Sequence, residues 1–420
     1  MSTAFKCADI LLPKDVSMDG WAVVACDQYT SEPEYWADVE KITCGEKSAY
    51  NLILPEVYLE NDDVDSRIEK IHENMEKYLS DDTFREYKDA LIYIERIQSD
   101  GKIRAGLIGA LDLEEYDYRK GSDSQVRATE ATVVERIPPR LKVRNGAPIE
   151  LPHIMILIDD NEKAIIEPLE ARKAEMEKLY DFTLMKNGGK ISGYLLTKDM
   201  QDKVFQGLDK LADLDGFNAK YGLNEKSALV YAMGDGNHSL ATAKEYYEQL
   251  KRENPHMDLS DHPARYALVE IVNLHSSALE FEAIHRIVMG VDREEMLDEM
   301  ADVLGISEEQ SEQKIQIVQS GELKDMYIHK ASSKLTVGSL QNFIDGYIAK
   351  KGGKVDYIHG VDVVKKLSMS DDAIGFILPD MGKEELFPTV ICDGALPRKT
   401  FSMGHAEDKR FYVEARKIVE

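Results

Sequence analysis

Hydrophobic positions along the chain follow two patterns, helical spacing and short uninterrupted runs. Apolar residues recur every three or four positions over 64–79 in a charged background, which predicts an amphipathic helix. Two apolar runs, 91–97 and 103–111, flank Ser99-Asp100-Gly101 and predict a β-hairpin. The polar segment 114–146 has no clear period, and it is therefore expected to be a long loop or a connecting arm.

The rest of the chain alternates between strand-like runs and helical spacing. Pro168 is expected to begin a helix that reaches about Tyr180, because proline suits the first helical position. Strands are predicted at 154–158, 191–197, 228–233, 267–274, 315–318, 325–329 and 373–378, and helices at 198–211, 240–250, 293–304 and 339–350.

Such a mixture predicts an α+β fold, with mixed sheets and flanking helices. We divide the sequence into an N-terminal α+β region with the polar arm (1–150), a central region (151–290) and a C-terminal α+β region (291–420). A single intertwined domain is the alternative. No internal repeat is visible.

The stretch 228–252 carries the clearest chemical signal. A strongly apolar strand runs into Gly234-Asp235-Gly236-Asn237-His238-Ser239, and an amphipathic helix follows. The first N–H groups of a helix lack internal partners, and glycines allow close approach to the backbone, so this turn could cradle a phosphate or carboxylate. His238 could donate to a bound oxygen, and Asp235 could orient it, hold a metal or act as a base. The alternative is a purely structural helix start, because Asp, Asn and Ser are also common capping residues.

Composition narrows the class of protein. The 420 residues contain 52 Lys+Arg against 78 Asp+Glu, a formal net charge of −26, which argues against a surface that grips nucleic acid or anionic lipid. The start lacks the pattern of a secretory signal, and no apolar stretch approaches the length of a membrane span. Four cysteines without a CxxC pair provide neither a disulfide scaffold nor a zinc framework, so a cytoplasmic setting is expected.

Four motifs, in the same order along the chain, resemble a bacterial and archaeal family called domain of unknown function 1015. Its hallmark Asp-Gly-His-His-Arg resembles 235–239, and its His-Glu-x-Thr segment resembles Thr129-Glu130-Ala131-Thr132. Its Thr-His-Arg segment is similar to 284–288, and its Met-Pro-x-Lys-Ser/Thr segment is similar to 396–401. The family often has a Tyr-Asp pair near the position of Asp27, whose loop is either part of the same cleft or a plain polar turn.

The hallmark in turn resembles the phosphate-binding helix start of the ParB and sulfiredoxin superfamily. This resemblance implies a ParB/sulfiredoxin-like strand–loop–helix core that receives nucleotide phosphates. The chain departs from the family at Asn237, in place of histidine, and at Ser239, in place of arginine. Loss of that arginine removes a fixed cation for phosphate oxygens, so the charge would have to come from elsewhere.

Five further residues are candidates for the same site. Glu130 could act as a general base, although a solvated or salt-bridged acid is the alternative. His285 and Arg286 could contact phosphate or form a structural pair within the sheet, and Arg398 and Lys399 could close over a ligand or form a basic surface turn.

The leading hypothesis is an enzyme that binds a nucleotide or a phosphorylated small molecule, with phosphoryl transfer to a small metabolite as its most concrete form. A nucleotide with Mg²⁺ is the expected cofactor. Asp235 and His238 would position phosphates or metal, and Glu130 would activate the acceptor hydroxyl. A non-catalytic nucleotide sensor is the second hypothesis, and a nucleic-acid-associated protein is the third. The oligomeric state stays open.

Overall fold

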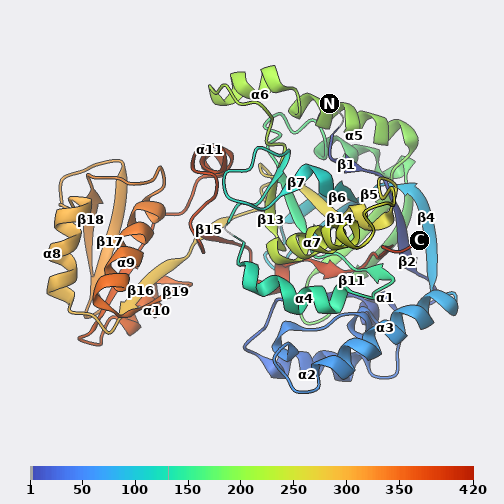
Figure 1. Ribbon diagram of the computed structural model, residues 1–420, viewed down its shortest axis with the longest axis horizontal. Coiled ribbons are helices and arrows are strands. Elements are labelled where there is room, and N and C mark those ends of the chain that lie inside the picture. Colours follow the sequence, from blue (N-terminus) through green and yellow to red (C-terminus); the bar gives the residue numbers. More distant parts are fainter. Residues whose placement is uncertain (1–2, 131) are drawn as a thin grey trace. The chain divides into compact units, whose positions relative to one another are not determined.

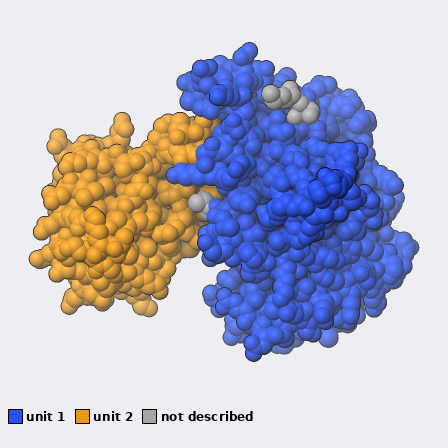
Figure 2. All heavy atoms as spheres, viewed as in Figure 1, with its two compact units in different colours: residues 1–128, 132–279, 404–420 blue, residues 129–131, 280–403 orange. Residues whose placement is uncertain are grey.

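The protein divides into two compact units (Figures 1 and 2). The computed structural model describes residues 3–130 and 132–420. Unit 1 comprises residues 1–128, 132–279 and 404–420, and unit 2 comprises residues 129–131 and 280–403. The predicted boundary at residue 150 lies within unit 1, so the three sequence regions are not these two units, and their value as a division into folding regions stays a prediction.

A mixed sheet forms the centre of unit 1, which confirms the predicted α+β class with mixed sheets. Its strands are β1 (Phe5–Lys6), β5 (Ile92–Ile97), β6 (Ile103–Asp112), β7 (Tyr116–Asp117), β8 (Val126–Arg127), β10 (Met155–Ile158), β11 (Glu177–Thr183), β12 (Lys190–Leu195), β13 (Tyr231–Asp235) and β14 (Tyr266–Asn273). The order is β11-β12-β5-β6-β14-β10-β13-β8-β7, with β1 beside β6. β10 runs parallel to β14 and antiparallel to β13, so the strand that leads into the candidate site lies inside the sheet and is paired on both sides.

Helices surround this sheet. They are α1 (Met18–Trp21), α2 (Pro33–Thr43), α3 (Val64–Ser80), α4 (Ile137–Arg144), α5 (Lys198–Leu211), α6 (Leu214–Tyr221) and α7 (Asn237–Glu253). α3 confirms the helix predicted at 64–79, and β5 with β6 confirms the hairpin. α4 and α7 pack against each other, as Figure 1 also shows.

Two expectations were wrong. The arm 114–146 contains α4, which begins at Ile137 with two prolines in its first turn, where no N–H donor is required. The helix expected at 168–180 is a 3₁₀ helix over Glu167–Glu175, followed by β11. Residues 177–183 are in a strand because they pair with β12 at the edge of the sheet, a non-local contact that helical spacing does not reveal.

The C-terminal segment 404–420 is built into unit 1 by short strand pairs. β22 (Phe411–Tyr412) pairs with β3 (Val23–Val24), and β23 (Arg416–Lys417) pairs with β9 (Ile149–Glu150). Outside the C-terminal segment, β2 (Ala8–Pro13) pairs with β4 (Phe84–Ala90) in another two-stranded sheet of unit 1.

Buried charges bind the same C-terminal segment to the sheet. Arg410 Nη1 lies 2.8 Å from Glu270 Oε2, and Arg410 Nη2 lies 2.6 Å from Glu414 Oε2. The second oxygen of Glu270 lies 3.2 Å from Arg104 Nε. All four side chains are at most 3% exposed, so these ions are satisfied by one another rather than by water.

Unit 2 is an antiparallel sheet with helices. Its strands are β16 (His285–Met289), β17 (Gln313–Gln319), β18 (Glu322–Ile328), β19 (Lys354–Ile358) and β20 (Ala373–Ile377), in the order β18-β17-β20-β16-β19. Its helices are α8 (Arg293–Leu304), α9 (Thr336–Lys351), α10 (Val361–Leu367) and α11 (Lys383–Asp393), and β15 (Phe281–Ala283) pairs with β21 (Phe401–Met403). Within the ranges that the structure describes, no helix combines the length and the apolar character needed to cross a bilayer.

Candidate functional site

The turn between β13 and α7 joins the end of a strand to the start of a helix through a left-handed glycine. Gly236 adopts φ +78°, a left-handed conformation that glycine reaches without strain, and α7 begins at the next residue. The Ser239 and Leu240 N–H groups donate to the Gly236 carbonyl at 3.0 and 3.1 Å. The earliest N–H groups of a helix have no acceptor inside it, so the positive end of α7 favours an anion here.

Glycine is also required at position 236 by close packing. A Cβ there would lie 3.1 Å from Ile154 Cα, on the segment that enters β10. A larger residue would therefore push the start of α7 away from the sheet. Gly234 belongs to the end of β13 and is half-buried.

Asp235 is paired with a lysine that sequence reasoning missed. Its Oδ1 accepts the Gly236 N–H at 2.9 Å, and its Oδ2 lies 3.3 Å from Lys409 Nζ. Both side chains are largely buried, at 21% and 14% exposure. Lys409 comes from the C-terminal segment, in an ordinary charged run, so nothing in the local sequence indicated its place.

Ser239 belongs to a hydrogen-bonded chain that also includes His153 and Tyr412. Ser239 Oγ lies 2.8 Å from His153 Nε2, and His153 Nδ1 lies 2.7 Å from the Tyr412 hydroxyl. That hydroxyl accepts the Cys26 N–H at 3.0 Å. Asp27 Oδ2 lies 3.8 Å from His153 Nε2, so the loop singled out near Asp27 does approach the helix start. Burial raises the pKa of Asp27, but His153, Gln28 and Lys409 outweigh it and hold the pKa below its ordinary value.

Asn237 and His238 complete the turn. The side-chain oxygen of Asn237 is buried and has no hydrogen-bond partner among the residues that the structure describes. His238 is half-buried, and its carbonyl accepts the Thr242 hydroxyl at 2.7 Å, which closes the first turn of α7 from within.

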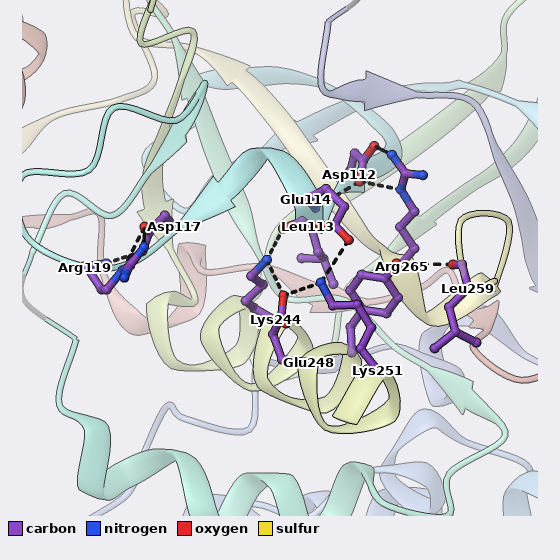
Figure 3. Close-up of polar contacts among 11 residues, drawn as sticks. Asp112, Leu113, Glu114, Asp117, Arg119, Lys244, Glu248, Lys251, Leu259 and Arg265 are labelled. Carbon is purple, nitrogen blue, oxygen red and sulfur yellow. Dashed lines mark hydrogen bonds and ion pairs between the residues drawn. The ribbon is translucent and has the colours of Figure 1, made fainter. Parts of the chain in front are cut away.

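The rest of α7 is fixed by charges along one face, drawn in Figure 3. Lys244 Nζ donates to the Leu113 carbonyl at 2.9 Å and lies 2.8 Å from Glu248. Lys251 lies 2.8 Å from Glu248 and 3.0 Å from Glu114, in the 3₁₀ helix Leu113–Glu115 that follows β6. These contacts hold the helix body, so the position of its N-terminus does not depend on the turn alone.

The other candidate residues lie in unit 2. Glu130 is half-buried beside Lys399 and Arg286, and the Thr400 and Lys399 N–H groups donate to its carboxylate. Burial raises the pKa of Glu130, against the opposing effect of these neighbours. Glu130 also forms a bridge with Leu396, so the 129–130 and 396–401 motifs lie side by side. Ala131 lies outside the described residues.

Arg286 and its neighbours make their contacts within unit 2. Arg286 is fully buried, and its three guanidinium nitrogens donate to Gln341 Oε1 and to the carbonyls of Ile284 and Arg398. Burial lowers its pKa to about 10. These contacts engage three guanidinium nitrogens within unit 2, and the role of the His285-Arg286 pair stays a prediction.

His285 and Arg398 also make contacts within unit 2. His285 Nδ1 accepts the Leu378 N–H at 3.3 Å, and burial lowers the pKa of His285. Arg398 donates to Tyr357 and lies 2.7 Å from Asp345. Asp235, His238 and the rest of the 234–239 turn belong to unit 1, so the candidates form one group in each unit.

The metal-ligating groups near α7 are few. Among the residues described, no three His, Cys, Asp or Glu side chains are grouped as a metal site. Mg²⁺ commonly takes one or two carboxylates together with substrate phosphates, and Asp235 and Asp27 could supply those carboxylates.

Comparisons with solved structures give distant likenesses only. A free serine kinase mutant in complex with AMP has a TM-score of 0.40 and 10% identity over 74% of this chain and 92% of that one. A conserved hypothetical protein from Pyrococcus furiosus has a TM-score of 0.35 and 9% identity over 74% and 95%. SbnI with a C-terminal truncation, from Staphylococcus aureus, has a TM-score of 0.36 and 10% identity over 71% and 82%. Similarity at this level indicates neither a ligand nor an activity for this chain, and the ParB/sulfiredoxin-like core stays a prediction.

Family membership is a firmer finding. The search of curated proteins gave no match. A family model described as protein of unknown function (DUF1015) matches residues 8–347, which include the turn 234–239, Glu130 and Arg286 but not the motif at 396–401. The chain therefore belongs to the DUF1015 family.

Proposed function

We propose that unit 1 binds a phosphorylated small molecule, in its most concrete form a nucleotide, with its phosphate at the start of α7. The proposal rests on two features that lie together at Asp235. The N-terminus of α7 begins two residues later, and Lys409 Nζ lies 3.3 Å from the Asp235 carboxylate. Main-chain N–H groups and the helix dipole favour an anion there, and Gly236 lets it approach the backbone.

Lys409 supplies the cation that the turn itself lacks. Ser239 stands where the family motif has arginine, so a phosphate at this turn needs a positive charge from another segment. Lys409 lies against Asp235, and a small movement of its side chain would bring the ammonium to a bound phosphate oxygen. Asn237 and Ser239 would add hydrogen bonds, and His238 would orient the phosphates.

The finer proposal is phosphoryl transfer to a small metabolite. The acceptor oxygen would bond to phosphorus, the bond from phosphorus to the departing nucleotide oxygen would break, and the acceptor proton would pass to a base. Mg²⁺ held by Asp235 and Asp27 would neutralise phosphate charge when bound. The assignment of Glu130 as the base stays a prediction.

Thermal-shift measurements with ATP, ADP, CTP and pyrophosphate, each with magnesium, test the binding proposal. A stabilising shift with at least one of them is expected, and Lys409→Met should weaken that ligand about tenfold, since a charge-assisted hydrogen bond is lost. Lys417→Met, an exposed lysine of the same C-terminal segment, is the matched control and should change nothing. No shift with any of the four ligands at millimolar concentration would contradict the proposal.

A non-catalytic sensor is the second candidate, favoured by the engaged carboxylate of Glu130. Two main-chain N–H groups already occupy that carboxylate, which suits an anchoring role better than proton transfer. A sensor would bind the nucleotide without turnover. Release of ADP from ATP by the wild type, abolished in Glu130→Gln with binding unchanged, would favour the enzyme.

A further inference from the structure

A pocket of about 150 Å³ lies in unit 1 between α4 and α7, beside the helix start. Ser239 and Thr242 line it from α7, and Arg140, Val143 and Arg144 line it from α4. The remaining wall comes from α3 and from the segments 52–59 and 147–154, so the pocket lies where these parts of unit 1 meet α4 and α7. A cavity of about this volume can hold a benzene molecule.

The wall of the pocket is mainly apolar and has balanced charges. Leu52, Leu54, Met75, Val143 and Leu268 are among its apolar lining residues. Its two arginines are each paired with a carboxylate that also lines it: Arg140 with Glu56, and Arg144 with Glu150 at 2.7 Å. A ligand with a net charge would have to break one of these pairs, and an uncharged ligand would not.

The hydroxyl of Ser239, which lines the pocket, is held by a hydrogen-bonded chain within the protein. Burial raises the pKa of Tyr412 well above its ordinary value, so its hydroxyl keeps its proton. The Tyr412 hydroxyl lies 2.7 Å from His153 Nδ1, and His153 Nε2 lies 2.8 Å from Ser239 Oγ, so the imidazole holds the serine side chain in position. Ser239 lines the pocket, so its hydroxyl is a polar group that a ligand there can contact.

We propose that this pocket binds a compact, uncharged molecule with an apolar body about the size of a six-membered ring and one oxygen that accepts a hydrogen bond from Ser239. The apolar wall contributes most of the affinity, and the serine fixes the orientation of the ligand. The pocket is a second ligand site, beside the phosphate site proposed at the start of α7, and Ser239 belongs to both. Its charge-balanced wall suits a different class of molecule.

Phenol and benzene are the probes, with binding followed by ligand-observed NMR and by titration calorimetry. Phenol should bind about fivefold more tightly than benzene, the ratio expected for one additional neutral hydrogen bond. Ser239→Ala should bring phenol to the affinity of benzene and leave benzene unchanged. Val143→Phe should abolish binding of both, because the larger side chain fills the pocket from α4.

Val134→Phe is the matched control, since Val134 is 58% exposed and precedes α4 outside the pocket. Circular dichroism checks that each variant is folded, and a misfolded Val143→Phe would be replaced by Leu268→Phe. Absence of phenol binding at millimolar concentration, or unchanged binding in both filled variants, would overturn the proposal. Nucleotide shifts measured on the wild type and on Val143→Phe separate the two sites, whereas Ser239→Ala changes a residue of both. Phenol binding without any nucleotide shift contradicts only the phosphate site, and nucleotide shifts without phenol binding contradict only the pocket.

Discussion

The cations of this protein differ in how many of their donors the protein itself uses. Arg286 donates from three nitrogens to acceptors within unit 2, so its charge is committed to the fold. Lys409 has a carboxylate neighbour, Asp235, at the start of α7. An ammonium is a compact charge on a flexible stem that can exchange one oxygen for another, whereas a buried guanidinium with three fixed acceptors cannot. The charge of Lys409 is therefore better placed than that of Arg286 to bind a ligand, although of these two residues only Arg286 belongs to a family motif.

Buried carboxylates make the stability of unit 1 depend on pH. Burial raises the pKa of Glu270, but Arg104 and Arg410 outweigh this effect and hold the pKa below its ordinary value. A pKa that is lower in the folded than in the unfolded state gives stability that is fully present above the unfolded value, about 4.3, and is lost as the pH falls through the folded value. We expect the free energy of unfolding, measured with urea, to be flat from about pH 7 to pH 5 and to fall steeply below about pH 4.

The control is Glu270→Gln, which removes the titrating group. This variant should be less stable at pH 7 by about 3–5 kcal/mol, because two buried arginines lose a partner. It should also show a shallower fall in acid. An identical acid slope in the variant would mean that other carboxylates cause the loss.

At the scale of elements, local sequence signals predicted those parts whose pattern is set within one segment. The helix at 64–79, the hairpin and the helix after Asn237 follow from spacing, turn residues and a left-handed glycine. β11 depends on its pairing with β12, and α4 depends on the burial of Ile137 and on packing against α7. The sequence of each segment alone therefore did not predict these two elements. For the same reason the turn 234–239 was predictable, but its partners His153 and Lys409 were not: both are distant in sequence and carry no motif.

The turn before α7 should be intolerant of any side chain at position 236. Gly236→Ala would place a non-glycine residue at φ +78° and a Cβ 3.1 Å from Ile154 Cα. The left-handed conformation alone costs about 1 kcal/mol, and the contact adds to it by displacing the helix start. We expect a lower free energy of unfolding in denaturant and a weakened nucleotide shift.

Gly222→Ala separates the two causes. Gly222 also has a left-handed conformation, with φ +64°, and a Cβ there would meet nothing within 4 Å. It should lose about 1 kcal/mol of stability and keep ligand binding unchanged. Equal losses in the two variants would show that the contact with Ile154 contributes nothing.

At the scale of the whole molecule, chain order and compact units do not coincide. Residues 129–131 belong to unit 2 although unit 1 continues on both sides of them, and residues 404–420 return to unit 1 after unit 2. Boundaries drawn along the sequence could not find this, because the return depends on buried ion pairs and short strands that join distant segments. The family model ends at residue 347, so the last residues of unit 1 are outside the match although they complete its core.

The return of the C-terminal segment predicts that unit 1 does not fold stably without it. Truncation after Met403 would remove Arg410 and Arg416, leaving Glu270 with Arg104 and Glu150 with Arg144 in sites that exclude water. Loss of one partner from a buried ion pair costs about 3–5 kcal/mol, a large part of the stability of an ordinary domain. The truncation would also remove the Val413 carbonyl, which accepts a hydrogen bond from Trp21, and the strands that pair with β3 and β9.

We expect the truncated chain to lose the cooperative urea transition of unit 1 while α8 and the unit 2 sheet keep their far-ultraviolet signal. Truncation after Ile418, which removes only exposed residues, is the matched control and should unfold like the full chain; if the truncation after Met403 did so as well, the buried ion pairs would not be what holds unit 1 together.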